Sequence, residues 1–550
     1  MRYLQASSKL RQLGPPLLSA ILFWMAFFPV NWPWLGWLAF VPWLVGIAGQ
    51  SSKQRLYSSL IFGLCFYGLA LNWMRVADIR MVATWAMLAV WAGLFTVILG
   101  WVVGKIYDRH PKGGMVLAFP MVIVPIEWMR AYALEGFPWY FLGHTQHDTL
   151  PLLQLAELGG AYLITLLVAL VNGIFADLWL GEKPECLLSF PLHRKAMGVG
   201  LAVTGALWFG YSRLGPTEFN EGTEIAVLQA DHPQGIRNSA GAEQVRVEYQ
   251  EMIRTLFQSH LRPLVLVWPE TSYPALVDIT DLDNSKWLPE KEKPNGPSQL
   301  LGASTIVEPK GEPSKQFNSA VLFDPKGIPI DHYDKIHRVP FGEYVPLKDW
   351  IPFINVLAPY DHDYSIAPGE RLTRFSLPYS PIPLVFGAAI CYESGDSHHF
   401  RSLAGGDGKP PVDFFINQSN DGWFHGTEEH EQHLLLLRFR AVETRRPVIR
   451  AVNMGISAWV DAYGRVLRPK EISGSPNEKT ARIFTITTEE LPTGEWGKFK
   501  QNTVVLVGPV PKRGNGIPMG WARLQGSWPG FFALGCVALI MFGGKQKARD

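Results

Sequence analysis

The sequence predicts two parts, a helical membrane domain and a soluble α/β domain, and two observations carry this prediction. Hydrophobic residues make up 48% of the 550-residue chain, and they concentrate in the first 213 residues and in about the last 25. In the block between, short apolar runs alternate with polar, helix-like stretches, which is typical of an α/β fold. We therefore divide the chain into a transmembrane domain (1–213), a soluble domain (214–520) and a C-terminal transmembrane helix with its tail (521–550).

About seven apolar segments precede the soluble block and one follows it. Several are shorter than the ~20 residues that cross a bilayer core, so their number and ends are approximate. The first segment follows basic residues as a signal peptide would, but a second segment comes almost at once without a cleavage site, and we predict that the first is retained. The expected spans are residues 16–30, 34–49, 57–74, 81–104, 115–130, 152–180, 196–211 and 528–542.

The distribution of Lys and Arg sets the expected orientation. With the N-terminus in the cytoplasm, the short loops on the opposite side hold only Arg75, Arg80 and Arg130. Residues 215–520 are then expected outside the cytoplasm, and the last span returns the tail to it. The cytoplasmic segments hold Arg2, Lys9, Arg11, Lys53, Arg55, Lys105, Arg109, Lys112, Lys183, Arg194, Lys195, Lys545, Lys547 and Arg549.

The soluble block begins with an apolar run and a helix. Residues 240–260 place Val245, Tyr249, Met252 and Phe257 along one face, which predicts a helix. A hairpin is expected near residues 461–464, where an Asp and a Gly supply turn chemistry. The runs expected to be strands are 225–228, 264–268, 301–306, 319–323, 384–390, 414–416 and 448–452.

Polar residues follow several of these strands at the point where each ends. Glu270 follows one, Cys391 another, and residues 417–421 a third. Because sites in α/β sheets assemble at the carboxyl ends of strands, we expect a carboxylate and a thiol to share one cleft.

The cysteines single out Cys391. Of the four, Cys65 and Cys536 lie in apolar spans and Cys186 in a polar loop, so no disulfide framework is expected. Cys391 is the one cysteine of the soluble block and follows the apolar run 382–390. An unpaired thiol in an oxidising compartment is a liability unless its thiolate is needed, although a buried cysteine without function is as common.

A nucleophilic cysteine needs a base, a positive group for the oxyanion and a wall that excludes water. The chain offers Glu270, Lys335 and Cys391 in that order. Each segment alone is a weak signal, because a Trp-Pro-Glu turn is more often a surface carboxylate and a lysine in a charged loop is usually solvated.

Together and in this order, the three segments resemble the nitrilase superfamily, whose catalytic set is Glu, Lys and Cys. With the apolar spans and residues 341–346, the chain resembles the bacterial apolipoprotein N-acyltransferases over almost its whole length. That resemblance implies an α-β-β-α sandwich for the soluble domain. Further matching segments are Glu127 and Trp128 with Arg130, residues 136–139, residues 419–424 and residues 446–453.

The resemblance implies a ping-pong acyl transfer through a thioester intermediate, which completes lipoprotein maturation. Cys391 would take a fatty acyl group from a phospholipid and pass it to the α-amine of a diacylglyceryl-cysteine at a lipoprotein N-terminus. Glu270 would be the general base. Lys335 and the backbone N–H of Tyr392 would stabilise the oxyanion.

Further positions match the family in supporting roles. Glu343 and Glu393 would orient the lysine and tune proton transfer. The soluble block is tethered to the membrane at both ends, so Cys391 is expected close to the bilayer surface. Apolar side chains around Phe341, Tyr344, Trp350, Phe353 and Trp423 are then expected to line a lipid entrance and keep water from the thioester.

The resemblance also implies partners and a location. The expected partners are the phospholipid acyl donor, the lipoprotein acceptor and the membrane, with a monomeric enzyme and no cofactor. The net charge of +2 gives no reason to expect nucleic acid. The expected location is the bacterial inner membrane, with several spans and the catalytic domain facing the periplasm.

One segment departs from the family pattern. After the first soluble strand the family usually shows Gln-x-Asn followed by a tryptophan, whereas this chain has Gln229 and Asp231 and no such tryptophan. An acyl-chain or acceptor contact made there by the family is therefore not expected to carry over.

Three other interpretations compete. His425, His430 and His433 invite a metal site, but the last two miss the His-Glu-x-x-His spacing by one residue, so no metal is expected. A membrane-anchored nitrilase-type amidase would need one anchor rather than several spans. A receptor or transporter with a ligand-binding ectodomain should carry ionisable residues in its spans, which hold few, and would not need Glu270, Lys335 and Cys391 together.

Overall fold

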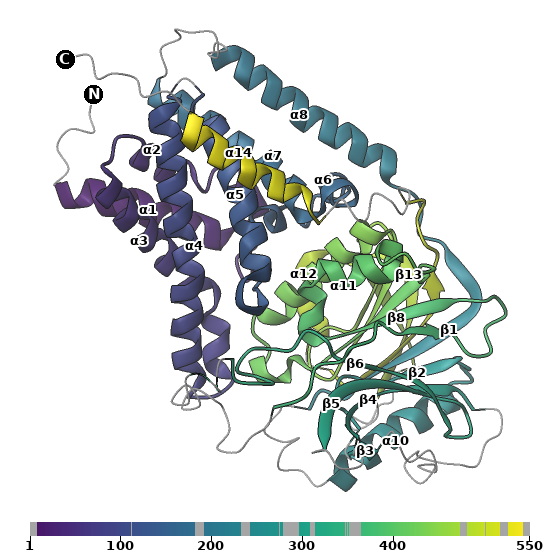
Figure 1. Ribbon diagram of the computed structural model, residues 1–550. Helices are drawn as coiled ribbons and strands as arrows, with labels where there is room; N and C mark the ends of the chain where they lie inside the picture. The colour runs from purple at the N-terminus through teal and green to yellow at the C-terminus, as the bar shows by residue number, and fades with distance from the viewer. Residues whose placement is uncertain are drawn as a thin grey trace, which may run out of the picture. The chain divides into compact units, whose positions relative to one another are not determined.

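The computed structural model shows a chain of two compact units (Figure 1). The first unit comprises Met1–Arg75, Met81–Leu214 and Arg523–Asp550, and the second comprises Val76–Arg80 and Gly215–Ala522. The expected boundary at residues 520 and 521 lies outside the described residues, as does the basic C-terminal tail. The structure describes residues 8–111, 113–181, 192–232, 242–273, 276–278, 296–307, 314–346, 348, 350, 365–473, 481–500, 502–516 and 526–542.

Helices coincide with every expected apolar segment of the first unit (Figure 1). Short turns and 3-10 segments connect several of them, including the segment Leu142–Gln146 (η4). The helices are α1 (Ser8–Met25), η1 (Pro33–Trp37), α2 (Val41–Ala48), α3 (Ser52–Ala70), η2 (Asn72–Val76), α4 (Met81–Arg109), α5 (Met115–Tyr132), η3 (Ala133–Glu135), α6 (Leu150–Leu153), α7 (Ala156–Leu180), α8 (Leu192–Arg213) and α14 (Trp528–Phe542).

Among the described helices, three are long and apolar enough to cross a membrane: Met81–Arg109, Met115–Glu135 and Ala156–Leu180. Shorter apolar helices occupy Gln12–Met25, Pro33–Ala48 and Trp528–Met541. The chain is therefore a membrane protein by these helices, while the larger number of spans and their orientation remain predictions.

Buried polar side chains of the first unit hold the loop that follows α5. Glu127 accepts hydrogen bonds from the backbone N–H of Leu142 (2.6 Å) and from Thr165 Oγ1 (2.7 Å). Arg130 donates to the carbonyls of Phe137 (3.0 Å) and Trp139 (2.7 Å). Both charged residues are buried. Inside a bilayer the backbone groups that they bind would have no water as an alternative partner.

The described residues of the second unit form two β-sheets. The larger has nine strands in the order β12-β13-β14-β1-β2-β4-β5-β6, with β3 paired to β4, and the smaller has five in the order β11-β10-β9-β8-β7. The larger sheet consists of β1 (Phe219–Gln229), β2 (Val265–Val267), β3 (Val277–Asp278), β4 (Ser298–Val307), β5 (Lys315–Phe323), β6 (Pro329–Asp334), β12 (Leu467–Ser473), β13 (Arg482–Glu490) and β14 (Val504–Pro511). The smaller consists of β7 (Arg374–Ser376), β8 (Val385–Ile390), β9 (Phe414–Ser419), β10 (Val448–Val452) and β11 (Ala458–Val460).

The alternation of side chains along β1 builds two cores. Ile225 and Val227 point into the core between the two sheets, and Ala226 and Leu228 point to the opposite face of the larger sheet. There they pack with helix α10 (Ala242–Gln258), which is the helix expected at 240–260; residues 240 and 241 lie outside the described residues.

Helices also cover the outer face of the smaller sheet (Figure 1). Phe400 of α11 (Ser397–Arg401) packs on Phe415 of β9 with ring centroids 4.6 Å apart. Every residue of α12 (Glu429–Thr444) is buried. The layers are thus helix, sheet, sheet, helix, which confirms the expected α-β-β-α sandwich.

Candidate active site

Cys391 begins a tight turn directly after a buried parallel strand. Strands β8, β9 and β10 run parallel, so their carboxyl ends meet at one edge of the smaller sheet. The cysteine turn, η6 (Cys391–Gly395), follows β8, and Cys391 has a φ of 50°. A residue with a side chain adopts this left-handed conformation at a cost of about 1–3 kcal/mol, so the surrounding contacts must hold it.

Glu270 follows β2, is buried and accepts a hydrogen bond from the Cys391 thiol. Its Oε1 accepts a hydrogen bond from Asn318 Nδ2 at 2.7 Å and lies 3.4 Å from Lys335 Nζ. Burial raises the pKa of Glu270, Lys335 opposes that rise, and the second carboxylate, Glu343, adds to it. Hydrogen bonds from Asn318 and from the Cys391 thiol lower the pKa in part. A carboxylate with a raised pKa that touches a thiol is suited to take the thiol proton.

Lys335 follows β6 and its ammonium lies among the two carboxylates. Nζ donates to Glu343 Oε1 at 2.7 Å, and Asn318 Nδ2 lies 3.1 Å from the same oxygen. The other oxygen of Glu343 accepts from the backbone N–H of Val339 at 2.7 Å. Burial lowers the pKa of Lys335, but the charges of Glu343 and Glu270 outweigh it, so the pKa is raised and the ammonium stays protonated.

The thiol of Cys391 is not a resting thiolate. Burial raises its pKa well above the usual range, Glu270 raises it further, and Lys335 lowers it only in part. A nearby cation favours the thiolate, but burial outweighs the effect of Lys335 on the pKa of Cys391. A neutral thiol needs a base before it can act as a nucleophile, and the carboxylate of Glu270 is within reach of it.

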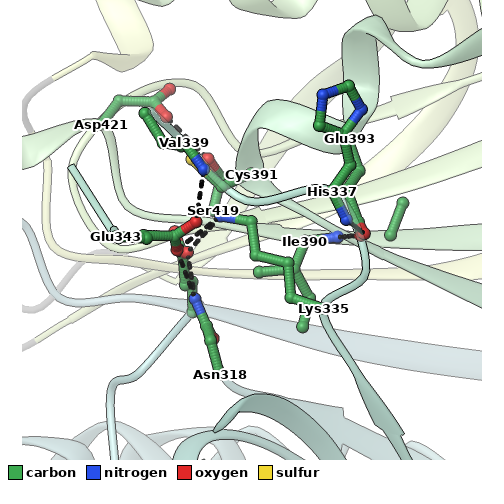
Figure 2. Close-up of polar contacts among 12 residues, drawn as sticks. Asn318, Lys335, His337, Val339, Glu343, Ile390, Cys391, Glu393, Ser419 and Asp421 are labelled. Carbon is green, nitrogen blue, oxygen red and sulfur yellow. Dashed lines mark hydrogen bonds and ion pairs between the residues drawn. The ribbon is translucent and has the colours of Figure 1, made fainter. Parts of the chain in front are cut away.

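Glu393 ties the cysteine turn to the loop after β6. Its Oε1 accepts from Tyr333 Oη (2.6 Å) and from the backbone N–H groups of Ile336 (2.9 Å) and His337 (3.0 Å). Its Oε2 accepts from the backbone N–H of Ile390 (2.7 Å). The side chain of Glu393 is fully buried (Figure 2). Its carboxylate therefore holds the cysteine turn and the segment that follows Lys335 in a fixed position relative to each other.

The expected substrate contacts lie on two loops. Phe341 and Tyr344 are half-buried on the loop that carries Glu343, and the N–H of Phe341 donates to the carbonyl of Tyr344 at 2.7 Å. Trp423 is half-buried in the turn Asp421–Phe424 (η8), which follows β9. Tyr392 lies in the cysteine turn. The structure thus groups Glu270, Lys335, Glu343 and Cys391 directly, and its contacts do not bear on the lipid roles of the aromatic side chains.

The histidines considered for a metal site have different positions. His425 is exposed, whereas His430 and His433 are buried. His430 Nε2 lies 3.1 Å from the backbone carbonyl of Asp421, and His433 Nδ1 lies 3.0 Å from Asp421 Oδ1.

Among the described residues, Asp421, Glu429 and His433 place their ligand atoms within 4.8 Å of one another. Arg450 already neutralises this group, because its guanidinium lies 2.6 Å from Asp421 Oδ2. A metal cation would have to sit beside that fixed positive charge, so the donor set does not fit one.

Sequence reasoning missed Asn318, and it named His433 only as a metal candidate and Asp421 and Arg450 only within longer segments. Asn318, inside β5, donates to both carboxylates of the site. Asp421, His433 and Arg450 form a buried network that contacts the cysteine turn. A polar side chain within an apolar strand was the one available signal for Asn318. The network joins segments more than a dozen residues apart, which no local pattern reveals.

Two family descriptions match consecutive parts of the chain. Residues 19–174 match the apolipoprotein N-acyltransferase N-terminal domain. Residues 225–491, which include Glu270, Lys335 and Cys391, match the carbon-nitrogen hydrolase family.

Named relatives match most of the length of the chain. The chain is similar to proteins named apolipoprotein N-acyltransferase from Geobacter metallireducens (28% identical, 82% of this chain and 85% of the relative), Caulobacter vibrioides (30%, 78% and 82%) and Vibrio cholerae (26%, 80% and 85%). The similarity thus extends across both units rather than the soluble one alone.

Proposed function

The chain belongs to the apolipoprotein N-acyltransferase family, and from that membership we propose which residues carry the acyl transfer and in what order. The family acts on lipid and lipoprotein substrates at a membrane. The proposed roles are Cys391 as nucleophile, Glu270 as general base, and Lys335 with the backbone N–H of Tyr392 as oxyanion donors.

In the first half-reaction the thiol of Cys391 attacks the ester carbonyl of a phospholipid. Glu270 takes the thiol proton as the C–S bond forms, and the negative charge on the carbonyl oxygen is stabilised by Lys335. The ester C–O bond then breaks, and the proton passes from Glu270 to the leaving alkoxide. The products are a thioester on Cys391 and a lysophospholipid.

In the second half-reaction the α-amine of diacylglyceryl-cysteine attacks the thioester. The C–N bond forms, Glu270 takes a proton from the amine, and the C–S bond breaks. The proton returns to the sulfur, so the enzyme ends as it began and the lipoprotein carries an amide. Glu343 and Glu393 position the lysine and the cysteine turn throughout.

The single observation that carries this proposal is the shared environment of Glu270. One buried carboxylate accepts a hydrogen bond from the Cys391 thiol and lies 3.4 Å from the Lys335 ammonium. Base, nucleophile and cation therefore need no rearrangement to act together. Further proposals are that the enzyme works as a monomer in the bacterial inner membrane, with the soluble unit in the periplasm and Phe341, Tyr344 and Trp423 at the lipid entrance.

A two-stage assay in detergent tests the function. The protein is incubated with phospholipid alone, Cys391 is examined by mass spectrometry for a thioester, and a diacylglyceryl-cysteine peptide is then added. We expect an adduct that persists until the peptide arrives and then leaves as an amide on its amine. Cys391→Ala should abolish the adduct, and Cys65→Ala, which removes another free thiol, should not.

The opposite pattern would support a different activity. Loss of the acyl group to water before the peptide is added, with no amide formed, would identify a membrane-anchored hydrolase of the amidase type. Absence of any adduct on the wild-type protein would remove Cys391 from the mechanism.

A further inference from the structure

A buried histidine contacts the backbone of the nucleophile. His433, on α12, has its Nε2 3.1 Å from the carbonyl oxygen of Cys391. A carbonyl oxygen can only accept, so Nε2 must carry the hydrogen, whichever way the other ring nitrogen is protonated. The hydrogen bond therefore exists in both the neutral and the charged form of the ring.

The opposite side of the ring is held by charged groups. His433 Nδ1 lies 3.0 Å from Asp421 Oδ1, 3.3 Å from Glu429 Oε1 and 3.0 Å from an Arg450 guanidinium nitrogen. Asp421 is in turn fixed by Arg450 (2.6 Å) and by Ser419 Oγ (2.7 Å). These side chains are all buried, so the ring has little freedom to rotate.

Two opposing effects act on the charge of this ring. Burial and Arg450 lower the pKa of His433, but Asp421 and Glu429 outweigh them and raise the pKa to about 9. At neutral pH the ring is then an imidazolium. A charged donor polarises the peptide group that it binds more strongly than a neutral one.

The carbonyl of Cys391 and the N–H of Tyr392 belong to one peptide group. A trans peptide is planar, and its C=O and N–H point to opposite sides. Fixing the oxygen by a hydrogen bond therefore fixes the direction of the N–H. The left-handed φ of Cys391 makes this restraint more necessary, because the backbone would otherwise relax to a commoner conformation.

We propose that His433 is a positioning residue for the oxyanion site: by holding the Cys391 carbonyl it aims the Tyr392 N–H at the oxygen of the tetrahedral intermediate. Asp421 and Arg450 hold the ring in place. This inference rests on the proposed function, in which that N–H is an oxyanion donor. It assigns to the buried cluster a role other than metal binding.

Two reactions of the same thiol test the proposal. Thioester formation passes through an oxyanion, whereas alkylation by chloroacetamide displaces chloride and does not. In His433→Asn the amide cannot reach the Cys391 carbonyl, so acylation should slow by about 10²- to 10³-fold, the usual effect of losing one oxyanion donor. Alkylation should stay within about threefold of wild type. In His433→Gln the amide nitrogen occupies the position of Nε2, so acylation should stay within about tenfold.

The matched control is His399→Asn. His399 is also buried and its Nε2 also lies near a carbonyl of β8, that of Ala388, at 2.8 Å. That carbonyl does not belong to the peptide group of the proposed oxyanion donor. Both reactions should stay within about threefold of wild type in this variant. If acylation slows as much as in His433→Asn, the effect of His433 would be explained by a general disturbance of packing.

Other outcomes overturn the inference directly. Equal slowing of acylation and alkylation in His433→Asn would show an action on the thiol itself, and unchanged acylation would show no role. If the Asn variant does not fold, a folded Gln variant that alkylates normally but acylates more than about 100-fold slower contradicts the proposal. Acylation is measured with two acyl donors, a phospholipid and a p-nitrophenyl ester. If the wild type accepts only the p-nitrophenyl ester, the proposed function is contradicted. The His433 variants can then still be compared with the wild type on that ester.

Discussion

The ammonium of Lys335 is 2.7 Å from Glu343 Oε1, closer than the 3.4 Å that separates it from the oxygen of Glu270. The stronger partner of the lysine is thus the carboxylate that does not serve as the proposed base. Glu270 keeps its contact with the thiol and still senses the positive charge. In the proposed mechanism the two carboxylates have different roles, because Glu343 holds the cation and Glu270 receives the proton.

Glu343→Gln should weaken the site through the lysine. Burial lowers the pKa of Lys335, and Glu343 is the first of the charges that raise it. Lys335 acts when protonated, so activity falls as pH rises through its pKa, and removing Glu343 moves that fall to lower pH. We expect acylation to slow by about 10- to 100-fold, the effect of one hydrogen bond between charged groups. A pH–rate profile tests this, with exposed Glu370→Gln as the control. The loss of rate at alkaline pH should begin at lower pH in Glu343→Gln than in the wild type and the control, and identical profiles would contradict the prediction.

Lys335→Met should remove oxyanion stabilisation and slow thioester formation by at least about 10²- to 10³-fold. It also leaves the buried Glu270 and the half-buried Glu343 facing each other without a cation, so the folded protein should lose about 3–5 kcal/mol of stability. The double variant with Glu343→Gln should recover part of that stability and none of the activity. Single-turnover acylation and thermal unfolding measure the two effects. Near-normal acylation in a folded Lys335→Met protein would exclude the lysine from the mechanism.

Glu270→Gln should separate acyl transfer from thiol reactivity. Loss of the general base should slow both half-reactions by about 10²- to 10⁴-fold. After burial, Glu270 is the next cause of the raised pKa of Cys391, so its removal should lower that pKa. The pH at which chloroacetamide alkylation reaches half its limiting rate should therefore fall while acylation slows. A rise of that pH would mean that Glu270 favours the thiolate rather than opposing it.

Glu393→Gln should destabilise the turn that presents the nucleophile. Its carboxylate accepts four hydrogen bonds, three of them from backbone N–H groups, and an amide nitrogen cannot accept. At least one buried donor loses its acceptor, which should lower the free energy of unfolding by about 1–3 kcal/mol. Tyr333→Phe removes one donor and leaves the carboxylate of Glu393 in place, so this variant should lose less stability than Glu393→Gln. The two variants are compared by thermal unfolding and by the rate of thioester formation. Equal losses in both variants would argue that the backbone contacts of Glu393 are not the cause of the lost stability.

The short apolar strands of the soluble block predicted an α/β fold, and the family resemblance implied the sandwich. Residues 448–452 were expected as a strand and form β10 with the same bounds. Strand β1 extends from Phe219 to Gln229, well beyond the apolar residues 225–228, because pairing with β14 rather than composition sets its length. Strands β12 to β14 were not expected, since their residues join the larger sheet only through that distant pairing.

Local sequence patterns pointed to Cys391 and Glu270, whereas Glu343 and Glu393 were expected only from the family resemblance. Cys391 and Glu270 each follow an apolar strand, which is a local signal. The contact of Glu343 with Lys335 spans a loop, and that of His433 with the cysteine turn joins two elements 42 residues apart. Such contacts depend on which strands become neighbours, and a single sequence does not contain that information locally.

The orientation of the soluble unit is the last prediction, and it rests on the asymmetry of Lys and Arg among the loops. A membrane-impermeant thiol reagent should modify Lys326→Cys, in the exposed turn after β5, and spare Lys53→Cys, exposed at the start of α3, when intact cells with a permeable outer membrane are treated. Both should react after the cells are lysed, which controls for accessibility. The background must lack the native thiols Cys65, Cys186, Cys391 and Cys536. Labelling of Lys53→Cys alone in intact cells would indicate the opposite orientation, and labelling of both positions would leave the proposed orientation without support. Either result would contradict the proposed access of the site to lipoproteins outside the cytoplasm.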